Sequence, residues 1–298
     1  MKKIRAAIVG YGNIGHYVLD ALEEAQDFEI SGIVRRNAND VPERLKPYKI
    51  VTSLAQLEGT DVAILCAPSR LVEKYATEAL ENGINCVDSF DIHTQVPAYR
   101  KRIGEIAKAH GKVAVISAGW DPGTDSMVRG ILKLCAPKGV TYTNFGPGMS
   151  MGHTVAVKAI EGVKKALSMT IPVGTGIHRR MVYVELQDGY KIDDVAARIK
   201  ADSYFAKDET HVTEVDCVDN LLDMGHGVNL VRKGVSGKTQ NQRFEFDMTI
   251  NNPALTGEIL VSTARASMLQ KPGSYTMIEI PIIDYLFGDR EKLVGELV

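Results

Sequence analysis

The first part of the chain alternates short apolar runs with longer amphipathic segments. The apolar runs predict buried strands at residues 4–9, 29–34, 61–66, 84–87 and 112–116. Amphipathic segments predict helices at 71–82 and 96–110, which end before Gly83 and Gly111, residues typical of a helix C-terminus. Strands that alternate with helices predict a Rossmann-type doubly wound parallel α/β sheet, in which ligands bind beyond the carboxyl ends of the strands.

The pattern changes after about residue 125. A helix is expected at 125–134, followed by longer alternating segments at 140–145, 179–186, 211–216 and 243–250, and by a helix at 252–269. These segments predict a second α+β domain with a mainly antiparallel sheet. We therefore expect a nucleotide-binding Rossmann domain at 1–122, joined by the C-terminal segment from about 253 to 298, and a second domain at 123–252.

A glycine motif directly follows the first predicted strand and opens a helix. Gly10, Gly12 and Gly15 have the G-x-G-x-x-G spacing in the strand–turn–helix context that this dinucleotide-binding motif requires. Gly10 allows the tight turn, Gly12 lets backbone N–H groups approach a pyrophosphate, and Gly15 lets the helix pack close to the strand.

Two arginines stand where such a motif usually has an acidic residue for the ribose hydroxyl. Arg35 and Arg36 follow the second predicted strand. Guanidinium groups cannot accept a hydrogen bond from a 2′-hydroxyl, but they suit a 2′-phosphate. The sequence therefore predicts NADP(H) rather than NAD(H). The alternative is a glycine-rich turn before a helix, with two solvated arginines after it.

Composition and charge narrow the class of protein. The 298 residues carry a formal net charge of −2 and 45% hydrophobic residues, so neither nucleic acid nor an anionic membrane is expected as a partner. The four cysteines show no C-x-x-C or zinc spacing, which is typical of a reducing compartment and predicts no metal site. We find no signal peptide and no apolar run near the roughly 18 residues of a membrane helix, and expect a cytoplasmic protein.

Two acidic residues end successive strands, at the place where a substrate beside a nicotinamide is expected. Asp91 and Asp121 stand there, and Asp88 is a third acid nearer its strand. Many NADP-linked alcohol dehydrogenases of similar layout have a lysine after the fifth strand, so carboxylates here indicate a cationic group on the substrate, such as an amine. The alternative is structural: Asp91 caps a helix, and Asp121 forms an Asx turn before Pro122.

The second domain carries a complementary polar set in apolar or glycine-flanked surroundings. An arginine supported by histidine, amide or hydroxyl groups is a suitable clamp for a carboxylate. As a structural alternative, His226 is a turn histidine and Asn252 a helix N-cap before Pro253. Trp120, the only tryptophan, is expected in the substrate site, and the glycine-rich segment 144–153 is expected to be a loop of the substrate domain. The members of the polar set are Thr170, Arg180, His226 and Asn252.

Together these segments resemble the meso-diaminopimelate dehydrogenase family over nearly the whole chain. The resemblance rests on residues 10–13, 87–91, 119–123 and 145–148 and on Gly152-His153. It implies that the D-centre of meso-2,6-diaminopimelate is oxidised with NADP+ to L-2-amino-6-oxopimelate, ammonia and NADPH, reversibly, in diaminopimelate and lysine biosynthesis. A homodimer is implied by the family alone. The shorter second domain is similar to the branch that tolerates other D-amino acids.

The resemblance also implies a role for individual residues. Asp91 and Asp121 bind the D-centre amine beside Trp120, and we expect Asp121, or a water that it holds, to take the amine proton. The middle of the pocket is formed by Phe145, Met151 and Gly152, and the distal L-centre is held by Thr170, Arg180, His226 and Asn252. Phe145 and Met151 are less polar than the tryptophan and glutamine found in much of the family. The implied cofactor contacts are Gly10, Tyr11, Gly12, Asn13, Ile14, Gly15, Arg35, Arg36, Cys66, Ala67, Pro68, Ser69, Ser89 and Phe90.

Three alternatives remain at this point. Two are enzymes: a general NADP-dependent D-amino acid dehydrogenase and a reductase similar to dihydrodipicolinate reductase. The third is an NADP(H)-binding redox sensor without catalytic activity. A sensor needs no clamp for a zwitterion, so the set of acids, arginine and histidine favours an enzyme.

Overall fold

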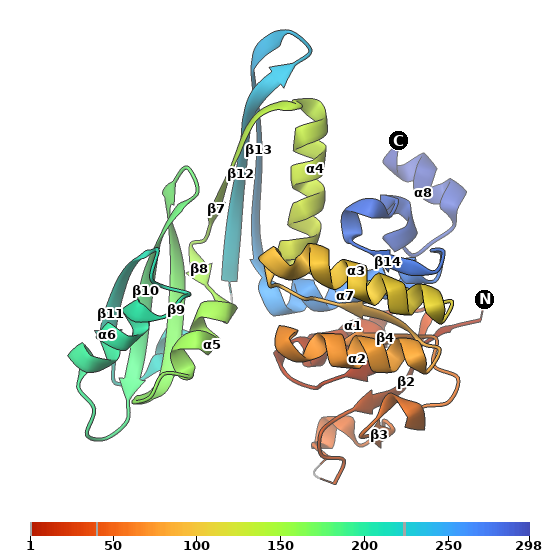
Figure 1. The fold of residues 1–298 in the computed structure, drawn as a ribbon, viewed down its shortest axis with the longest axis horizontal. Helices are drawn as coiled ribbons and strands as arrows, with labels where there is room; N and C mark the ends of the chain where they lie inside the picture. The colour runs from red at the N-terminus through yellow and green to blue at the C-terminus, as the bar shows by residue number, and fades with distance from the viewer. Residues whose placement is uncertain (1, 40, 223–224) are drawn as a thin grey trace. The chain divides into compact units, whose positions relative to one another are not determined.

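The chain forms two compact units, seen here in a computed structural model that describes residues 2–39, 41–222 and 225–298 (Figure 1). Unit 1 comprises Met1–Gly130 and Pro253–Val298, and unit 2 comprises Ile131–Asn252. The division falls inside helix α4 (Asp125–Cys135), whereas the boundary expected from the sequence lies before this helix, between residues 122 and 123.

Unit 1 contains a seven-stranded parallel sheet in the order β14-β6-β5-β4-β1-β2-β3, which confirms the predicted Rossmann-type fold. Two of its strands, β3 and β14, are too short to give a hydrophobic pattern and were not predicted. The chain order reverses between β1 and β4, where this fold commonly binds its ligand. The strands are β1 (Ile4–Val9), β2 (Phe28–Val34), β3 (Ile50–Val51), β4 (Val62–Leu65), β5 (Asn85–Asp88), β6 (Val113–Val115) and β14 (Gly273–Tyr275).

Helices cover both faces of this sheet. Along β1, Ala6 and Ile8 face a core with α1 (Asn13–Glu24) and α7 (Asn252–Ser267). Ala7 and Val9 face a second core with α2 (Ser69–Glu81) and α3 (Val96–Ala109). This alternation follows from the period of two along a strand.

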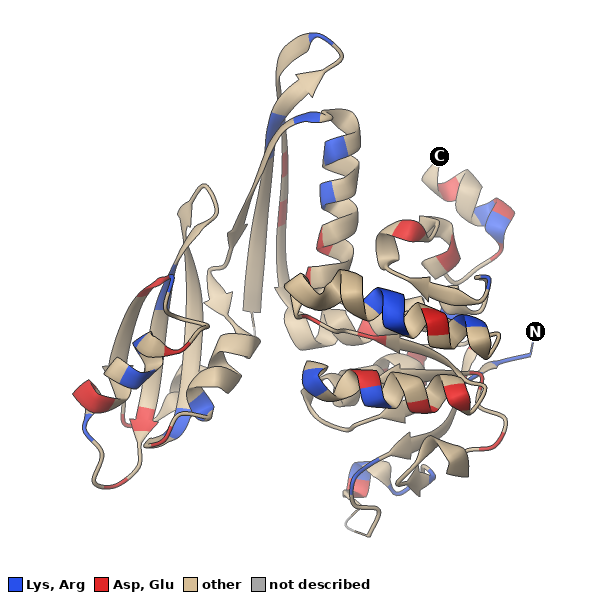
Figure 2. Ribbon diagram, viewed as in Figure 1, with Lys and Arg blue, Asp and Glu red and all other residues tan. Residues whose placement is uncertain are grey.

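Both charge signs occur along α2 and α3 (Figure 2), and Arg102 of α3 pairs with Glu73 of α2. The C-terminal helix is α8 (Arg290–Leu297).

Unit 2 contains two sheets rather than the single one that we expected. The orders are β11-β10-β9-β8 and β13-β12-β7. All pairs are antiparallel except β10 with β11, because helix α6 crosses over between these two strands and returns the chain in the same direction. The elements are β7 (Lys138–Phe145), β8 (Gly148–Met149), α5 (Met151–Lys158), β9 (Val163–Gly174), β10 (Ile177–Leu186), α6 (Ile192–Ala201), β11 (Glu209–Glu214), β12 (Gly225–Ser236) and β13 (Thr239–Asn251).

Helices α5 and α6 cover the four-stranded sheet and complete its core. Val157 of α5 and Ile199 of α6 pack against Val182 and Val184 of β10. Among the described residues, no helix combines the length and the apolar character needed to cross a membrane. The short helical turns are η1 (Glu43–Leu45), η2 (Leu54–Gln56), η3 (His93–Gln95), η4 (Trp120–Thr124), η5 (Val218–Leu221), η6 (Met277–Glu279) and η7 (Ile282–Tyr285).

The contact between α7 and α1 gives a test of this packing. A Cβ atom at Gly257 would lie 2.8 Å from the backbone carbonyl carbon of Tyr17 and 3.0 Å from the amide of Val18. Because backbone atoms of a helix cannot move aside easily, Gly257→Ala should lower the free energy of unfolding by about 1–3 kcal/mol in urea titrations. The control is Gly295→Ala in α8, where no described atom lies within 4 Å of the added Cβ. This change should be neutral or stabilising, since alanine favours helix. Equal effects of the two substitutions would contradict the packing argument.

Candidate functional site

The glycine motif forms the tight turn between β1 and α1. Gly10 has a φ of +96°, and a Cβ there would lie 2.8 Å from the carbonyl oxygen of Cys66. A Cβ at Gly15 would lie 2.3 Å from the carbonyl oxygen of Gly10. Gly12 differs, because its Cβ would meet no described atom within 4 Å. Two glycines are therefore required by packing, while the backbone at Gly12 is open to a pyrophosphate at the start of α1.

The first of the two arginines after β2 directly follows Val34, whose carbonyl oxygen accepts from the Gly10 N–H at 2.9 Å. The backbone N–H of Arg35 donates to the carbonyl oxygen of Val51 at 2.8 Å, which fixes the chain after the strand. Burial raises the pKa of Tyr11 in the glycine turn, and the charges of Arg44 and Arg35 are among the influences that oppose the rise, so Arg35 lies within electrostatic range of this turn. Arg36 is exposed. These residues fit a dinucleotide that carries a 2′-phosphate.

The loops after β4 and β5 are joined through Asp91. The hydroxyl of Ser69 donates to Asp91 Oδ1 at 2.6 Å, and the Asp91 backbone N–H approaches Ser69 Oγ at 3.3 Å. The short helix η3 that follows has Ile92 at its N-cap, so the structure does not support the alternative in which Asp91 caps a helix. Asp91 is exposed. It is therefore tied to a predicted cofactor loop but open to a ligand.

A buried carboxyl joins the loops after β5 and β6. Asp88 Oδ1 accepts hydrogen bonds from the backbone N–H groups of Phe90 and Ser117, each at 2.9 Å. Its Oδ2 accepts from the Tyr99 hydroxyl at 2.8 Å, and its backbone oxygen accepts from the Ala118 N–H at 2.7 Å. Burial raises the pKa of Asp88 to about 6, although these hydrogen bonds oppose the rise. Asp88 thus holds together the two loops that carry Asp91 and Asp121.

Asp121 belongs to an ion-pair network that sequence reasoning missed. Arg129 of α4 donates to Asp121 Oδ1 at 2.9 Å, and the His93 Nε2 lies 3.9 Å from Asp121 Oδ2. The carboxylate is therefore paired with a guanidinium. Asp121 keeps 14% of its side chain exposed, and the neighbouring Trp120 is buried. The pairing of Arg129 with Asp121 could not be predicted from the sequence, because the segment between the two residues contains a turn and the start of a helix and has no regular period.

A glycine turn in unit 2 brings together three of the predicted substrate residues, Phe145, Thr170 and His226. A Cβ at Gly146 would lie 2.1 Å from the carbonyl oxygen of Thr170. A Cβ at Gly148 would lie 2.2 Å from the carbonyl oxygen of Gly225. Both glycines have positive φ, +92° and +151°. Only glycine permits this approach, which places Phe145 beside β9 and β12. The rings of Phe145 and His226 are parallel, with centroids 6.4 Å apart.

Arg180 lies at the centre of the polar set in unit 2. It pairs in register with Thr170 across β9 and β10, and its Nη1 donates to Thr170 Oγ1. Its Nε donates to Asp208 Oδ2 at 2.6 Å. Only 12% of the Arg180 side chain is exposed. The sequence analysis did not identify Asp208, because an acid in the irregular segment before β11 resembles any solvated loop residue.

Three histidines near this guanidinium, His153, His178 and His226, have lowered pKa values and are therefore neutral near pH 7. Burial first and the charge of Arg180 second lower the pKa of His226 to about 4 and that of His153 to about 4. The same two causes lower the pKa of His178, whose Nε2 accepts from the Phe145 backbone N–H at 2.8 Å. The set therefore presents one guanidinium, paired with Asp208, among neutral imidazoles near pH 7. Such an arrangement suits a carboxylate.

The other predicted substrate residues occupy ordinary structural positions. Met151 begins α5 and packs beside a small core of Met149, Leu167 and Val218, and Gly152 is exposed next to it. The predicted loop at 144–153 is thus replaced in part by β8 and α5. His226 lies in β12 rather than in a turn, and Asn252 is the first residue of α7. The roles of these residues stay predictions.

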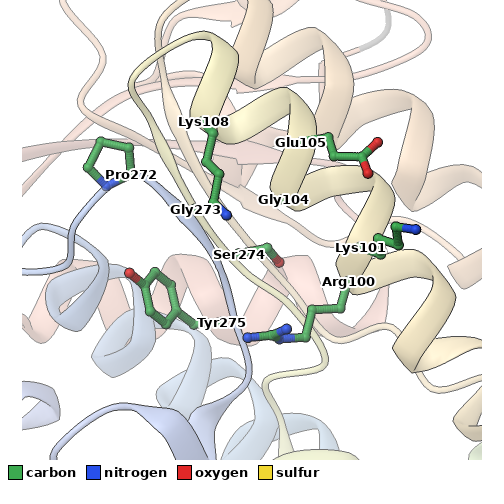
Figure 3. A pocket seen from close by; sticks show the side chains of 9 residues that line it. All are labelled: Arg100, Lys101, Gly104, Glu105, Lys108, Pro272, Gly273, Ser274 and Tyr275. Carbon is green, nitrogen blue, oxygen red and sulfur yellow. The ribbon is translucent and has the colours of Figure 1, made fainter.

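A cavity elsewhere in unit 1 takes no part in this arrangement. It has a volume of about 350 Å³ and lies between α3 and β14, where Figure 3 shows the Lys108 side chain reaching toward the segment that carries Gly273 and Ser274. Its described lining contains none of the predicted site residues. Arg100, which also lines it, pairs with Glu279.

The chain is similar to known proteins along its full length. Residues 119–179 match the diaminopimelic acid dehydrogenase C-terminal domain, and residues 10–115 match the homoserine dehydrogenase NAD binding domain. Meso-diaminopimelate D-dehydrogenase from Bacteroides fragilis is 68% identical over 299 residues, which cover 100% of both chains. The enzyme of the same name from Ureibacillus thermosphaericus is 34% identical and covers 94% of this chain and 95% of its own.

Two solved structures have the same architecture. The C. glutamicum DAP dehydrogenase in complex with DAP matches with a TM-score of 0.89 and 26% identity, covering 100% of both chains. An engineered D-amino acid dehydrogenase bound to NADP+ matches with a TM-score of 0.85 and 25% identity, also over 100% of both chains.

The depressed pKa values of the histidines in unit 2 can be tested directly. Arg180→Met should raise the pKa of His226 and of His153 from about 4 toward the usual 6.5, because it removes the nearby charge but not the burial. NMR titration of the imidazole signals measures this shift. The control is Arg179→Met, whose side chain points to the other face of β10 and pairs with Glu209. Equal shifts in both variants, or none in either, would show that Arg180 does not set the charge state of these histidines.

Proposed function

Since the chain belongs to the meso-diaminopimelate D-dehydrogenase family, as its motifs had indicated, we propose that it oxidises the D-centre of meso-2,6-diaminopimelate with NADP+. Membership of this family makes it an oxidoreductase that acts on CH–NH2 groups. The products are L-2-amino-6-oxopimelate, ammonia and NADPH, and the reverse direction is a reductive amination. The similar structures with DAP and with NADP+ support both ligands as candidates.

The observation that carries this proposal is the separation of charge between the two polar sets. Unit 1 presents the carboxylates of Asp91 and Asp121 at strand ends beside the glycine turn, and unit 2 presents the guanidinium of Arg180 among neutral histidines. A diamino dicarboxylic acid carries ammonium and carboxylate groups at both ends. The acids suit the ammonium of the reacting centre, and Arg180 suits the distal carboxylate.

The residues of the chain hold and deprotonate the substrate. Asp91 and Asp121 bind the ammonium at the D-centre, Trp120 shapes the wall beside it, and Thr170 with Arg180 fixes the distal end. Holding both ends orients a single Cα–H bond, so stereochemistry follows from positioning. The ammonium must lose a proton before the C–H bond can break, and Asp121, or a water that it holds, accepts this proton. When bound, NADP+ would be the acceptor of the hydride.

Turnover with a distal variant tests the substrate. The parent should reduce NADP+ with meso-diaminopimelate, and the reverse reaction should require ammonia. Arg180→Met should raise the KM for meso-diaminopimelate by about tenfold or more, because a charge-assisted hydrogen bond contributes about 1.5–3 kcal/mol. Small D-amino acids without a second carboxylate should be affected much less. An equal loss for both classes would assign Arg180 to folding, and a parent that prefers small D-amino acids would favour a general D-amino acid dehydrogenase.

The cofactor preference is tested by replacing the arginines after β2. Arg35→Ser with Arg36→Ser should raise the KM for NADP+ and leave that for NAD+ nearly unchanged, since each bond between a guanidinium and the 2′-phosphate contributes about 1.5–3 kcal/mol. Steady-state kinetics with both cofactors measure the ratio. As a control, Arg102→Gln removes another partly exposed arginine, one that pairs with Glu73 on the helical surface, and should not change the ratio. An unchanged preference in the double variant would place both arginines outside the cofactor site.

A further inference from the structure

A buried carboxyl that the proposed reaction does not use lies directly beneath Asp121 and Trp120. Asp125 is the first residue of α4, and its side chain has 0% exposure. Its backbone N–H donates to the Trp120 carbonyl oxygen, and the Trp120 side chain is among the groups that act on the pKa of its carboxyl. Asp125 therefore anchors the tryptophan of the proposed amine site through the backbone.

The same carboxyl shares a cation with Asp121. Arg129 lies with Nη1 at 2.9 Å from Asp121 Oδ1 and with Nη2 at 3.5 Å from Asp125 Oδ2. The side chains of Asp121 and Arg129 are 14% and 29% exposed. Two carboxylates around one guanidinium carry a net charge of −1 when both are ionised. A single proton on either carboxyl makes the group neutral.

Asp125 is the carboxyl that retains this proton more readily in the free protein. Burial first and the charge of Asp121 second raise its pKa to about 7, while Arg129 and the Trp120 side chain oppose the rise. His93 of η3 also faces the network, with its Nε2 at 3.9 Å from Asp121 Oδ2. The charge on Asp125 therefore changes near neutral pH.

We propose that Asp125 is a positioning residue that acts through Arg129 and Trp120, and that its negative charge makes Asp121 able to accept the proton of the substrate ammonium. This inference rests on the proposed function for the identity of that proton donor. Its basis in the structure is the guanidinium shared by two carboxyls, one buried and one reaching solvent.

The charge balance of the proton transfer shows why the ionised form is needed. As the N–H bond of the ammonium breaks, its electron pair stays on nitrogen and the proton forms an O–H bond with Asp121. With Asp125 ionised, the network of Asp121, Asp125 and Arg129 goes from −1 to 0. With Asp125 protonated, the network goes from 0 to +1 in a partly buried site. The second change is less favourable because no carboxylate then balances the guanidinium.

The decisive experiment is the pH dependence of Asp125→Asn. The amide has nearly the same shape but cannot ionise, so the variant is fixed in the state that the parent has at low pH. We expect kcat for meso-diaminopimelate to be lowered by about tenfold near pH 9 and by less than about threefold near pH 6, since about one unit of coupling between the carboxyls corresponds to a tenfold change. KM should change little. A loss of kcat by one constant factor at all pH values would overturn the inference.

A titration without substrate separates this inference from the proposed function. NMR of carboxyl-labelled aspartate should show two carboxyls with raised pKa values in the parent, Asp88 at about 6 and Asp125 at about 7, and the second signal should be missing in Asp125→Asn. If that signal persists in the variant, the inference fails whatever the substrate is. If the signal is Asp125 but the parent does not oxidise meso-diaminopimelate, the proposed function fails and the charge sharing stands.

Two further variants guard against misfolding. Asp61→Asn changes another aspartate of unit 1, which accepts from the Arg5 backbone N–H and precedes β4, away from the strand carboxyl ends. Its pH profile should equal that of the parent. If Asp125→Asn does not fold, Arg129→Lys keeps the cation but removes the forked geometry. It should shift the titration near pH 7 and the acid limb of kcat by the same amount, and independent movement of the two would contradict the proposal.

Discussion

Asp88 is the group on which the geometry of unit 1 depends most. Its carboxyl accepts the backbone N–H groups of Phe90 and Ser117, and thus joins the loops after β5 and β6. Burial of an ionisable group is costly, and here it raises the pKa to about 6. Three hydrogen bonds offset part of that cost. The adjacent strands of a parallel sheet bring the loops near each other, but this carboxyl fixes the distance between them.

The electrostatic design of the two units differs in a way that follows from burial. In unit 2, burial and the charge of Arg180 lower the pKa values of the neighbouring histidines, so Arg180 and its carboxylate partner Asp208 lie among neutral imidazoles. In unit 1, the partly exposed Asp121 and the buried Asp125 share the guanidinium of Arg129, and burial raises the pKa of Asp125 to about 7. Environment, rather than residue type, gives chemically identical carboxyls different tasks.

Much of the fold could be predicted from the sequence because its signals are local. The glycine turn, the buried strands and the glycines at helix ends are each determined by neighbouring residues, and the structure contains the elements that they indicated. Strands β3 and β14 were missed because two or three residues give no pattern. The parallel pairing of β11 was missed because the direction of a strand depends on the crossover before it, which a hydrophobic period does not reveal.

The candidate site was less predictable, for a related reason. Strand ends identified Asp91 and Asp121, since position in the topology is enough to place them. Arg129, Asp125 and Asp208 gave no signal, because each matters only through a contact made after folding. The distance from Arg180 to Thr170 depends on the register between β9 and β10. The distance between the rings of Phe145 and His226 depends on a glycine turn between two sheets.

The partners that were missed change how binding at this site should be understood. Both Asp121 and Arg180 already have a resident partner of opposite charge, Arg129 and Asp208. A substrate that engages them exchanges or shares ion pairs instead of pairing isolated charges. The net gain in affinity is therefore smaller than a new charge-assisted bond would give, but no charge is left buried without a partner when the substrate leaves. Each of the two polar sets holds its side chains in position before binding, and in the proposed reaction the binding energy of a doubly zwitterionic substrate serves mainly to orient the reacting carbon.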